Sequence, residues 1–281
     1  MTPKPVTTYL SITTIAGKCP VNCKKYCPQE LIWKNYSGNT RMTLQQLQRF
    51  TADIPRTTSM YIGGFSEPFM NPETVSMLEW LNQEGFNIRL FTTGVGLKKK
   101  DLDRVCMIPF DMFVLHEPDA CGIAHIPYHK DYGWILWNLK TRIKNFRSMN
   151  MNPIDFETNH REDVARGEWF QAKFRLTRTC LFMKYPRYEL MPNGEVYFCC
   201  ECSCISMGIG NMNLTPYNEL VKKHEEFVKE FRGNPKSICQ NCCLSIPKWK
   251  DDITIFINKL KGEVPLKERP VLKQIWDIVM K

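Results

Sequence analysis

The chain has 281 residues, 43% of them hydrophobic and 24% charged, which is enough for one barrel-sized α/β domain or two smaller domains. No apolar run reaches the length of a membrane span and the amino terminus lacks the apolar core of a signal peptide, so we expect a cytoplasmic protein without a membrane partner. The formal charge of +9 is spread in short runs, which favours solvated helix faces over nucleic-acid binding and suits an anionic substrate or partner.

Strand-like and helix-like patterns alternate over the first 160 residues. The predicted strands, rich in β-branched and aromatic residues, cover residues 9–16, 59–64, 87–93, 111–116 and 153–158. The predicted helices cover residues 43–50, 71–85, 98–108 and 133–146. The last of these has an apolar stripe made of Ile135, Leu139, Ile143 and Phe146. This alternation predicts parallel βα units in a single sheet.

Two of the predicted helices carry clear end signals. Thr43 and Gln46 have the spacing of a capping box at the start of the first helix. In the second helix, Asn71 is the expected N-cap, Pro72 the first helical residue and Gly85 the stop. These signals predict where the two helices begin and where the second one ends.

Polar or cysteine residues follow every predicted strand. In chain order they are the cysteines of residues 19–27, the segment "GGFSEP" at 63–68, Thr92 and Thr93, His116 and Glu117, and Glu157. Open parallel sheets and α/β barrels both place their active sites at the carboxyl ends of the strands. The sequence therefore predicts one site that gathers these segments.

Thirteen cysteines are present, which is an odd number in a chain without an export signal. A disulfide framework needs an oxidising compartment and an even set of partners, so metal or redox chemistry is the better explanation.

The first cysteine cluster lies in "CPVNCKKYCP", which contains Cys19, Cys23 and Cys27. Pro20 and Pro28 argue against a helix that would place the three thiols on one face. A closed zinc site needs four ligands, and no fourth cysteine or histidine is near. The favoured interpretation is an iron–sulfur cluster with one iron left open for a substrate, and a zinc site or inert cysteines are the alternatives.

The character of the chain changes after about residue 173, where a second group of cysteines begins. Its members are Cys180, Cys199, Cys200, Cys202, Cys204, Cys239, Cys242 and Cys243. Residues 188–200 are expected to form a hairpin with its turn at 192–194, and a helix is expected from Thr215 to about Phe231. This unit has too little core of its own, so we expect a bound metal to stabilise it.

Together these motifs resemble the radical S-adenosylmethionine (radical SAM) superfamily, in members that carry a SPASM extension or the shorter twitch extension. The signature loop of that family has three cysteines with an aromatic residue before the last one. Tyr26 precedes Cys27 here, although three residues, not two, separate Cys23 from Cys27. The resemblance implies that Cys19, Cys23 and Cys27 hold a 4Fe-4S cluster that binds SAM, with Tyr26 beside the cofactor.

A second motif of the family, Gly-Gly-Glu-Pro, binds the amino group of SAM. Glu67 matches its end in "GGFSEP", whereas Gly63 and Gly64 are offset by two positions. The resemblance implies that these three residues contact SAM, and it makes Thr92 and Thr93 candidates for its ribose or carboxylate. A solvated loop acid is the alternative for Glu67, and turn-forming residues are the alternative for the threonines.

The carboxyl-terminal cysteines resemble a twitch unit, in which four cysteines hold an auxiliary 4Fe-4S cluster. The matching ligands are Cys180, Cys199, Cys239 and Cys242. Cys200 or Cys243 could replace a neighbour, and Cys202 and Cys204 exceed the pattern of four. A zinc ribbon is the alternative for this unit.

We therefore expect a partial (β/α)6 TIM-like barrel over residues 1–172. A small cysteine-rich extension of the SPASM/twitch type should follow over residues 173–250, and a helical tail over residues 251–281. The expected fold class is α/β.

The resemblance implies an enzyme that cleaves SAM to a 5′-deoxyadenosyl radical, with an electron from a reductase, a flavodoxin or a ferredoxin. The radical would take a hydrogen atom from a small-molecule, sugar-like or peptide substrate, which leads to oxidation, epimerisation or crosslinking. His116 and Glu157 are the candidate catalytic side chains. The alternative is a zinc- or cluster-stabilised binding protein, a relative without catalytic activity.

Overall fold

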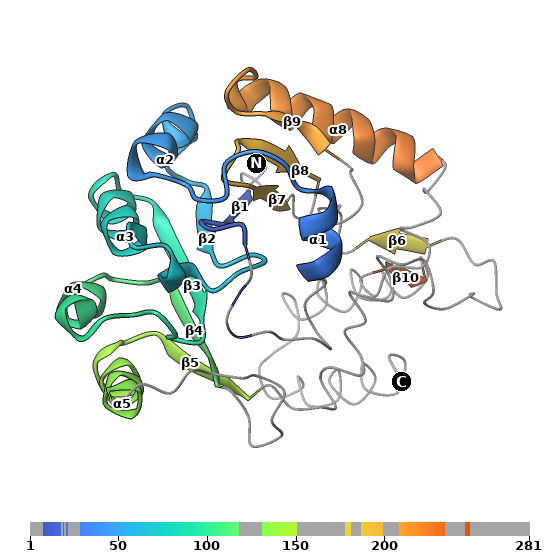
Figure 1. Cartoon of the computed structure of the whole chain (residues 1–281). Helices are drawn as coiled ribbons and strands as arrows, with labels where there is room; N and C mark the ends of the chain where they lie inside the picture. Colours follow the sequence, from blue (N-terminus) through green and yellow to red (C-terminus); the bar gives the residue numbers. More distant parts are fainter. Residues whose placement is uncertain are drawn as a thin grey trace, which may run out of the picture.

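The computed structural model describes residues 8–17, 19, 21, 29–117, 131–150, 178–180, 187–198, 208–233 and 245–247. Within these residues, eight strands form one curved sheet in the order β5-β4-β3-β2-β1-β7-β8-β9, and β6 pairs with β10 in a second sheet (Figure 1). The strands are β1 (Tyr9–Ile12), β2 (Ser59–Ile62), β3 (Asn87–Thr92), β4 (Met112–Glu117), β5 (Phe146–Asn150), β6 (Arg178–Cys180), β7 (Arg187–Leu190), β8 (Glu195–Tyr197), β9 (Gly208–Asn211) and β10 (Ser245–Pro247).

The strands β5, β4, β3, β2, β1 and β7 run parallel to their neighbours. In the middle of this set, Leu10 of β1 pairs with Met60 of β2 on one side and with Tyr188 of β7 on the other. The predicted parallel α/β arrangement is thereby confirmed. Because all of these strands point the same way, the loops that follow them meet at one edge of the sheet.

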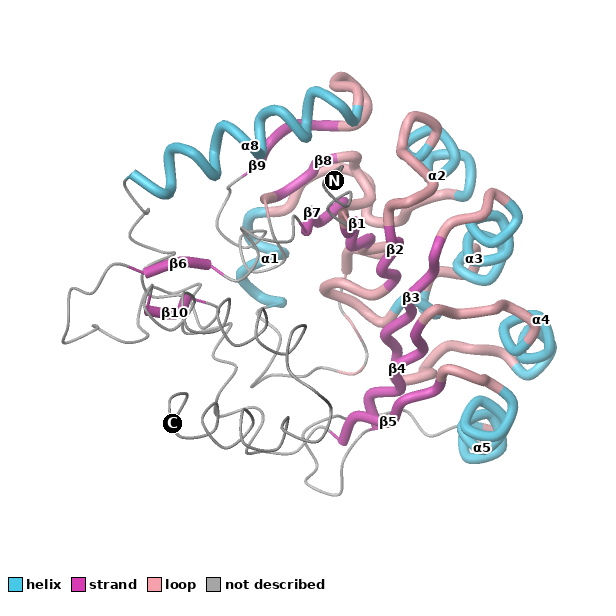
Figure 2. Tube along the Cα trace, turned by 180° about the vertical axis from the view of Figure 1, so that it is seen from behind, coloured by secondary structure: helices cyan, strands magenta, loops and turns pink. Residues whose placement is uncertain are grey.

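Helices cover the convex face of the sheet, as Figures 1 and 2 show. They are α2 (Leu44–Thr51), α3 (Thr74–Gln83), α4 (Leu102–Cys106) and α5 (Tyr132–Arg142), with 3-10 turns η1 (Pro68–Met70) and η2 (Lys99–Asp101) before α3 and α4. Every second residue of the strands, such as Leu10, Ile62 and Leu90, is buried in the core on this face. The apolar sides of the helices, with Leu47 of α2 and Leu78 of α3, form the other half of this core. Two further helices are α1 (Gln29–Asn35) and α8 (Tyr217–Gly233). In the part of the chain that the structure describes, no helix has the length and apolar character to cross a membrane.

Two predicted helix ends are confirmed. The Gln46 N–H donates to the Thr43 hydroxyl oxygen at 3.1 Å, and the Thr43 N–H donates to the Gln46 side-chain oxygen at 2.8 Å, which is the capping box of α2. Gly85 follows α3 with a φ of 78°, and the Phe86 N–H donates to the Leu81 carbonyl at 3.1 Å. The left-handed glycine lets the chain close the last turn of the helix.

The predicted start of α3 is wrong, because α3 begins at Thr74 and not at Pro72. In the turn before the helix, Asn71 accepts the Glu73 N–H on its side-chain oxygen at 3.0 Å. Its amide donates to the Thr14 carbonyl at 2.9 Å and to the Met42 carbonyl at 2.8 Å, and both bonds are buried. The Thr14 carbonyl also accepts the Met42 N–H at 2.9 Å. Asn71 therefore links two other loops to the turn that precedes α3.

The predicted helix over residues 133–146 is too long. α5 ends at Arg142, and Phe146 starts β5, where it pairs with Phe113 of β4 and stacks on it with ring centroids 5.8 Å apart. Ile135 and Leu139 are buried on α5 as predicted. The predicted strand 153–158 lies outside the described residues, and β5 occupies the place beside β4.

The predicted hairpin and the predicted carboxyl-terminal helix are confirmed. β7 and β8 pair antiparallel around the turn at 192–194, where Gly194 has a φ of 87°, and α8 begins at Tyr217. Since β7 also pairs with β1, this hairpin continues the main sheet. The domain boundary near residue 172 and the tail after residue 250 fall in segments outside the described residues and stay predictions.

His224 of α8 lies between α8 and the hairpin, with 2% of its surface exposed. Its ring stacks on Phe198 at a centroid distance of 4.6 Å and meets the Tyr188 ring at 5.0 Å. Burial among these rings disfavours the imidazolium and lowers the pKa of His224 from 6.5 to about 4.

We expect His224 to make the folded state less stable as the pH falls from about 6.5 toward about 4, by up to about 3 kcal/mol. In this range the unfolded chain binds a proton at residue 224 and the folded chain does not, so protonation favours unfolding. His224→Phe keeps the aromatic packing and should remove this part of the pH dependence. Urea unfolding of both proteins across this range measures the difference, and equal pH dependence in the two would contradict the expectation.

Candidate functional site

The carboxyl-terminal edge of the parallel sheet carries the candidate site. The loops after β1, β2 and β3 meet there beside the end of β4, as the strand pattern predicted. The described members are Cys19, Gly63, Gly64, Glu67, Thr92, Thr93 and His116.

Cys19 lies in the loop after β1 and is half-buried against the loop after β2. Burial raises the pKa of the Cys19 thiol, and the negative charge of Glu67 acts in the same direction. Hydrogen bonds from the backbone of Val21 and Glu67 and from the Ser66 side chain act in the opposite direction. These donors fit a thiolate sulfur, which is the form that binds iron.

The two glycines after β2 are required by close packing. A Cβ atom on Gly63 would lie 3.2 Å from the Phe91 Cβ atom and 3.3 Å from the Phe91 carbonyl oxygen. A Cβ atom on Gly64, whose φ is +76°, would lie 2.0 Å from the Thr13 hydroxyl oxygen and 2.6 Å from a Glu189 carboxylate oxygen. The "GG" pair therefore lets the β2 loop cross closely over β1, β3 and β7.

Glu67 is a buried carboxylate with 4% of its surface exposed, and it joins the β2 loop to the end of β3. One carboxylate oxygen accepts hydrogen bonds from the Thr92 hydroxyl and from the Phe69 N–H, the latter at 3.2 Å. The other accepts from the N–H and the hydroxyl of Thr93, both at 2.7 Å. Burial raises the pKa of Glu67, and the hydrogen bonds from Thr92, Thr93 and Phe69 oppose that rise. Glu67 is thus not a solvated loop acid, and Thr92 and Thr93 bind it directly.

We expect Glu67→Gln to lower the free energy of unfolding by about 1–3 kcal/mol. Each carboxylate oxygen accepts one backbone N–H, from Phe69 and from Thr93, so an amide NH2 group must leave one of these buried donors without an acceptor. Glu73→Gln is the matched control, because among the described residues the Glu73 side chain accepts one backbone N–H, that of Leu44 at 2.9 Å, and an amide oxygen can serve as this acceptor. Chemical unfolding of the two variants should show a loss only at residue 67, and equal losses would contradict this role.

A second buried carboxylate at this edge, Glu189 of β7, was not found from the sequence. Glu189 is 0% exposed and accepts a hydrogen bond from the Thr13 hydroxyl at 2.7 Å, while the Phe65 N–H donates to the Thr13 hydroxyl oxygen at 3.2 Å. Thr13 and Glu189 are 176 positions apart, and only the pairing of β1 with β7 brings them together. An acidic residue inside the apolar strand "YEL" is the one local signal of a buried polar contact.

His116 lies at the end of an aromatic row on the face of the sheet opposite helices α2–α5. The Tyr61 and Phe91 rings stack with centroids 5.5 Å apart, and the Phe91 ring meets His116 edge-on at 5.9 Å. Arg89 donates to the Tyr61 hydroxyl at 2.5 Å and pairs with Asp111. The row has an imidazole at the carboxyl-terminal edge, and at its other end the Arg89 guanidinium lies 5.2 Å from the centroid of the Tyr61 ring.

Several predicted site residues lie outside the described residues. They are Cys23, Tyr26, Cys27, Glu157, Cys199, Cys200, Cys202, Cys204, Cys239, Cys242 and Cys243. Within the described ranges, no group of three or more cysteine, histidine, aspartate or glutamate side chains is arranged to hold a metal. Cys180 ends β6, and its backbone pairs with Ser245 of β10, which follows Cys243 by two positions in the sequence.

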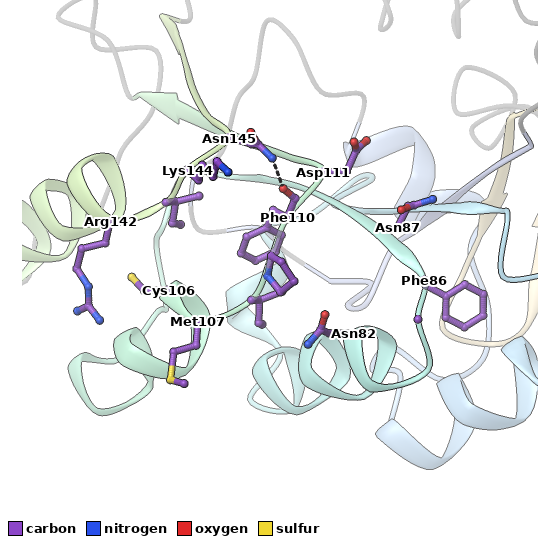
Figure 3. A pocket seen from close by; sticks show the side chains of 14 residues that line it. Asn82, Phe86, Asn87, Cys106, Met107, Phe110, Asp111, Arg142, Lys144 and Asn145 are labelled. Atoms are coloured by element: carbon purple, nitrogen blue, oxygen red, sulfur yellow. Dashed lines mark hydrogen bonds between the residues drawn. The ribbon is translucent and has the colours of Figure 1, made fainter.

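A pocket of about 560 Å³ lies at the other edge of the sheet (Figure 3). Its walls come from the loops that precede β3, β4 and β5 and include Phe86, Phe110 and Lys144. The Asn145 side chain donates to the Phe110 carbonyl at 2.7 Å across it. This is the amino-terminal edge, where parallel α/β folds do not place their active sites, so the pocket is separate from the candidate site.

Comparison with solved structures finds the same fold in three radical SAM enzymes. BtrN, solved with AdoMet and 2-DOIA, superposes with a TM-score of 0.62 over 84% of this chain and 92% of its own, at 14% identity. Streptococcus suis SuiB, bound to the precursor peptide SuiA, superposes with a TM-score of 0.56 over 85% of this chain and 70% of its own, at 14% identity. Native anSMEcpe with bound AdoMet superposes with a TM-score of 0.54 over 97% of this chain and 100% of its own, also at 14% identity.

The chain has the fold of these enzymes. No protein-family model and no curated protein matches the sequence. The parallel α/β part of the fold prediction is therefore confirmed by the structural similarity. A sequence identity of 14% supports a shared fold and nothing beyond it. In this fold, Cys19 and the β2 loop lie together at the carboxyl-terminal edge.

Proposed function

We propose that this chain is a radical SAM enzyme. The observation that carries the proposal is the contact of Cys19 with Ser66 and Glu67 at the carboxyl-terminal edge of the sheet. It brings the first cysteine of the signature-like loop against the "GGFSEP" segment, the two motifs on which the resemblance rests. The shared fold with enzymes solved with AdoMet supports the same conclusion.

Cys19, Cys23 and Cys27 would hold a 4Fe-4S cluster, and the hydrogen-bond donors around the Cys19 sulfur fit that role. When bound, the cluster supplies the electron that splits SAM into methionine and a 5′-deoxyadenosyl radical. Gly63 and Gly64 let the β2 loop lie close to the sheet, and Glu67 fixes this loop to the end of β3. We assign to these two loops and to Tyr26 the binding and orientation of SAM.

The substrate would lie over the concave face of the sheet, where Tyr61, Phe91 and His116 form the aromatic row. In this proposal His116 would take or give a proton at a substrate atom, and Glu157 is the second candidate for this role. The same fold is seen with 2-DOIA in BtrN and with a precursor peptide in SuiB. We therefore propose a sugar-like small molecule or a peptide as the substrate class, with hydrogen abstraction as the first step.

The carboxyl-terminal cysteines would hold an auxiliary 4Fe-4S cluster through Cys180, Cys199, Cys239 and Cys242. The β6–β10 ladder supports this assignment, because it pairs Cys180 with Ser245, three positions after Cys242. A small cysteine-rich unit of this kind gains stability from a bound metal.

Anaerobic reconstitution with iron and sulfide tests the proposal. We expect about eight irons per chain, from two four-iron clusters, and 5′-deoxyadenosine from SAM when the protein is reduced with dithionite. Metal analysis and chromatography of the nucleoside products provide the two measurements. A colourless zinc protein, or an iron protein that leaves SAM intact, would support the zinc- or cluster-stabilised binding protein instead.

A further inference from the structure

The outer side of α5 carries two exposed tryptophans beside a run of lysines. Trp134 is 43% exposed and Trp137 is 62% exposed, and they lie one turn apart on α5. Lys98, Lys99 and Lys100 are exposed at the start of η2, and the Lys99 ammonium lies 4.7 Å from the centroid of the Trp134 ring. We call these five residues the Trp/Lys patch. α4, which follows η2, and α5 are neighbours on the convex side of the sheet (Figure 1).

The buried side of the same helical turn reaches the site. Tyr132 is buried with Val21 and Val95 in a small apolar cluster, and Cys19 and Leu136 pack against this cluster. Trp134 lies between Tyr132 and Leu136 in the sequence and faces the solvent. Tyr132 therefore connects the helix that carries Trp134 to the apolar cluster against which Cys19 packs.

The segments that carry the patch are fixed in place. The Tyr132 hydroxyl donates to the Thr93 carbonyl at 2.6 Å, which ties the first turn of α5 to the end of β3. Gly96, two residues before Lys98, has a φ of +89°, and a Cβ atom there would lie 2.7 Å from the Phe69 carbonyl oxygen. The lysine run is thus held close to the site by a tight loop.

The charge of the patch is not balanced by nearby acids. Asp101 pairs with Arg104 at 2.9 Å, and Asp103 pairs with Arg142 at 2.7 Å. Among the described residues, Lys98, Lys99 and Lys100 form no ion pair. Exposed tryptophans supply binding energy at protein interfaces, and a field of one sign steers an oppositely charged partner.

Resting on the proposed function, we infer that the Trp/Lys patch docks an acidic one-electron carrier protein that reduces the cluster held by Cys19. In this step one electron leaves the reduced flavin or iron–sulfur group of the carrier and enters the 4Fe-4S cluster. The carrier is oxidised by one electron, and no atom is transferred. The patch places the partner on α5, the helix whose Tyr132 packs in the same apolar cluster as Cys19.

Binding of a flavodoxin to the reconstituted full chain tests the inference. In the patch variant, Lys98, Lys99 and Lys100 are replaced by glutamine, and in the matched control the exposed Lys222, Lys223 and Lys229 of α8 are replaced in the same way. At low ionic strength we expect the Kd for flavodoxin to rise about tenfold or more in the patch variant and to stay unchanged in the control. Added salt should remove most of this difference, because it screens exposed charges.

SAM cleavage with two reductants separates this inference from the proposed function. With reduced flavodoxin, the patch variant and Trp134→Ser should release 5′-deoxyadenosine more slowly than the control, and with dithionite all variants should match the wild type. An absence of cleavage with dithionite in the wild type would refute the proposed function. Wild-type cleavage with dithionite, together with equal flavodoxin affinity in the patch variant and the control, would refute the docking surface. A loss of self-association or of binding to anionic lipid vesicles, with flavodoxin affinity unchanged, would refute it as well.

Discussion

Replacing Cys19 by alanine is expected to reduce 5′-deoxyadenosine production from SAM to the level of a sample without protein. The proposed cluster would need all three thiolates of the loop, since one iron is left open for the cofactor. The iron content should fall from about eight to about four per chain, because the proposed auxiliary cluster would have separate ligands. Product chromatography and iron analysis after anaerobic reconstitution measure both effects.

Cys106→Ala is the matched control for this experiment. Cys106 is also a half-buried free thiol, but it ends α4 near the amino-terminal edge of the sheet. Its replacement should keep both the iron content and the cleavage of SAM. Cleavage that survives in Cys19→Ala would refute the assignment of the loop, and a loss in both variants would point to a general effect of thiol removal. Circular dichroism of the two variants shows whether the fold is kept.

Local signals predicted the parts of the fold that depend on neighbouring residues. The capping box of Thr43 and Gln46 needs only residues three apart, and the stop at Gly85 needs only a left-handed residue. The Asn71 side-chain oxygen accepts the Glu73 N–H, which is a local contact, but its amide also binds the Thr14 and Met42 carbonyls of two other loops. These long-range bonds are set by tertiary structure, so no local pattern reveals them.

In the candidate site as well, some contacts could be predicted from the sequence and others depend on long-range pairing. The rule that parallel strands end at one edge placed Glu67, Thr92 and Thr93 together, and the structure joins them by hydrogen bonds. The contact between Thr13 and Glu189 depends on a strand more than 170 residues away, whose pairing with β1 the sequence does not show. This is also why the hairpin was expected in a separate unit, although β7 extends the main sheet.

Gly64→Ala is expected to lower the free energy of unfolding by about 3 kcal/mol or more, through two separate effects. An alanine at a φ of +76° carries backbone strain of about 1–2 kcal/mol. The added methyl group would lie 2.0 Å from the Thr13 hydroxyl oxygen, and moving that side chain breaks its buried hydrogen bond to Glu189. Overpacking of this kind costs about 1–3 kcal/mol.

Gly85→Ala isolates the first effect, the backbone strain. Gly85 has nearly the same φ, +78°, but a Cβ atom there would meet nothing within 4 Å. We therefore expect it to lose about 1–2 kcal/mol, from backbone strain alone. The difference between the two variants in urea unfolding measures the close approach of the β2 loop to β1 and β7. Equal losses would mean that residue 64 needs glycine only for its backbone angle, and that the tight crossing over Thr13 and Glu189 does not hold the site in place.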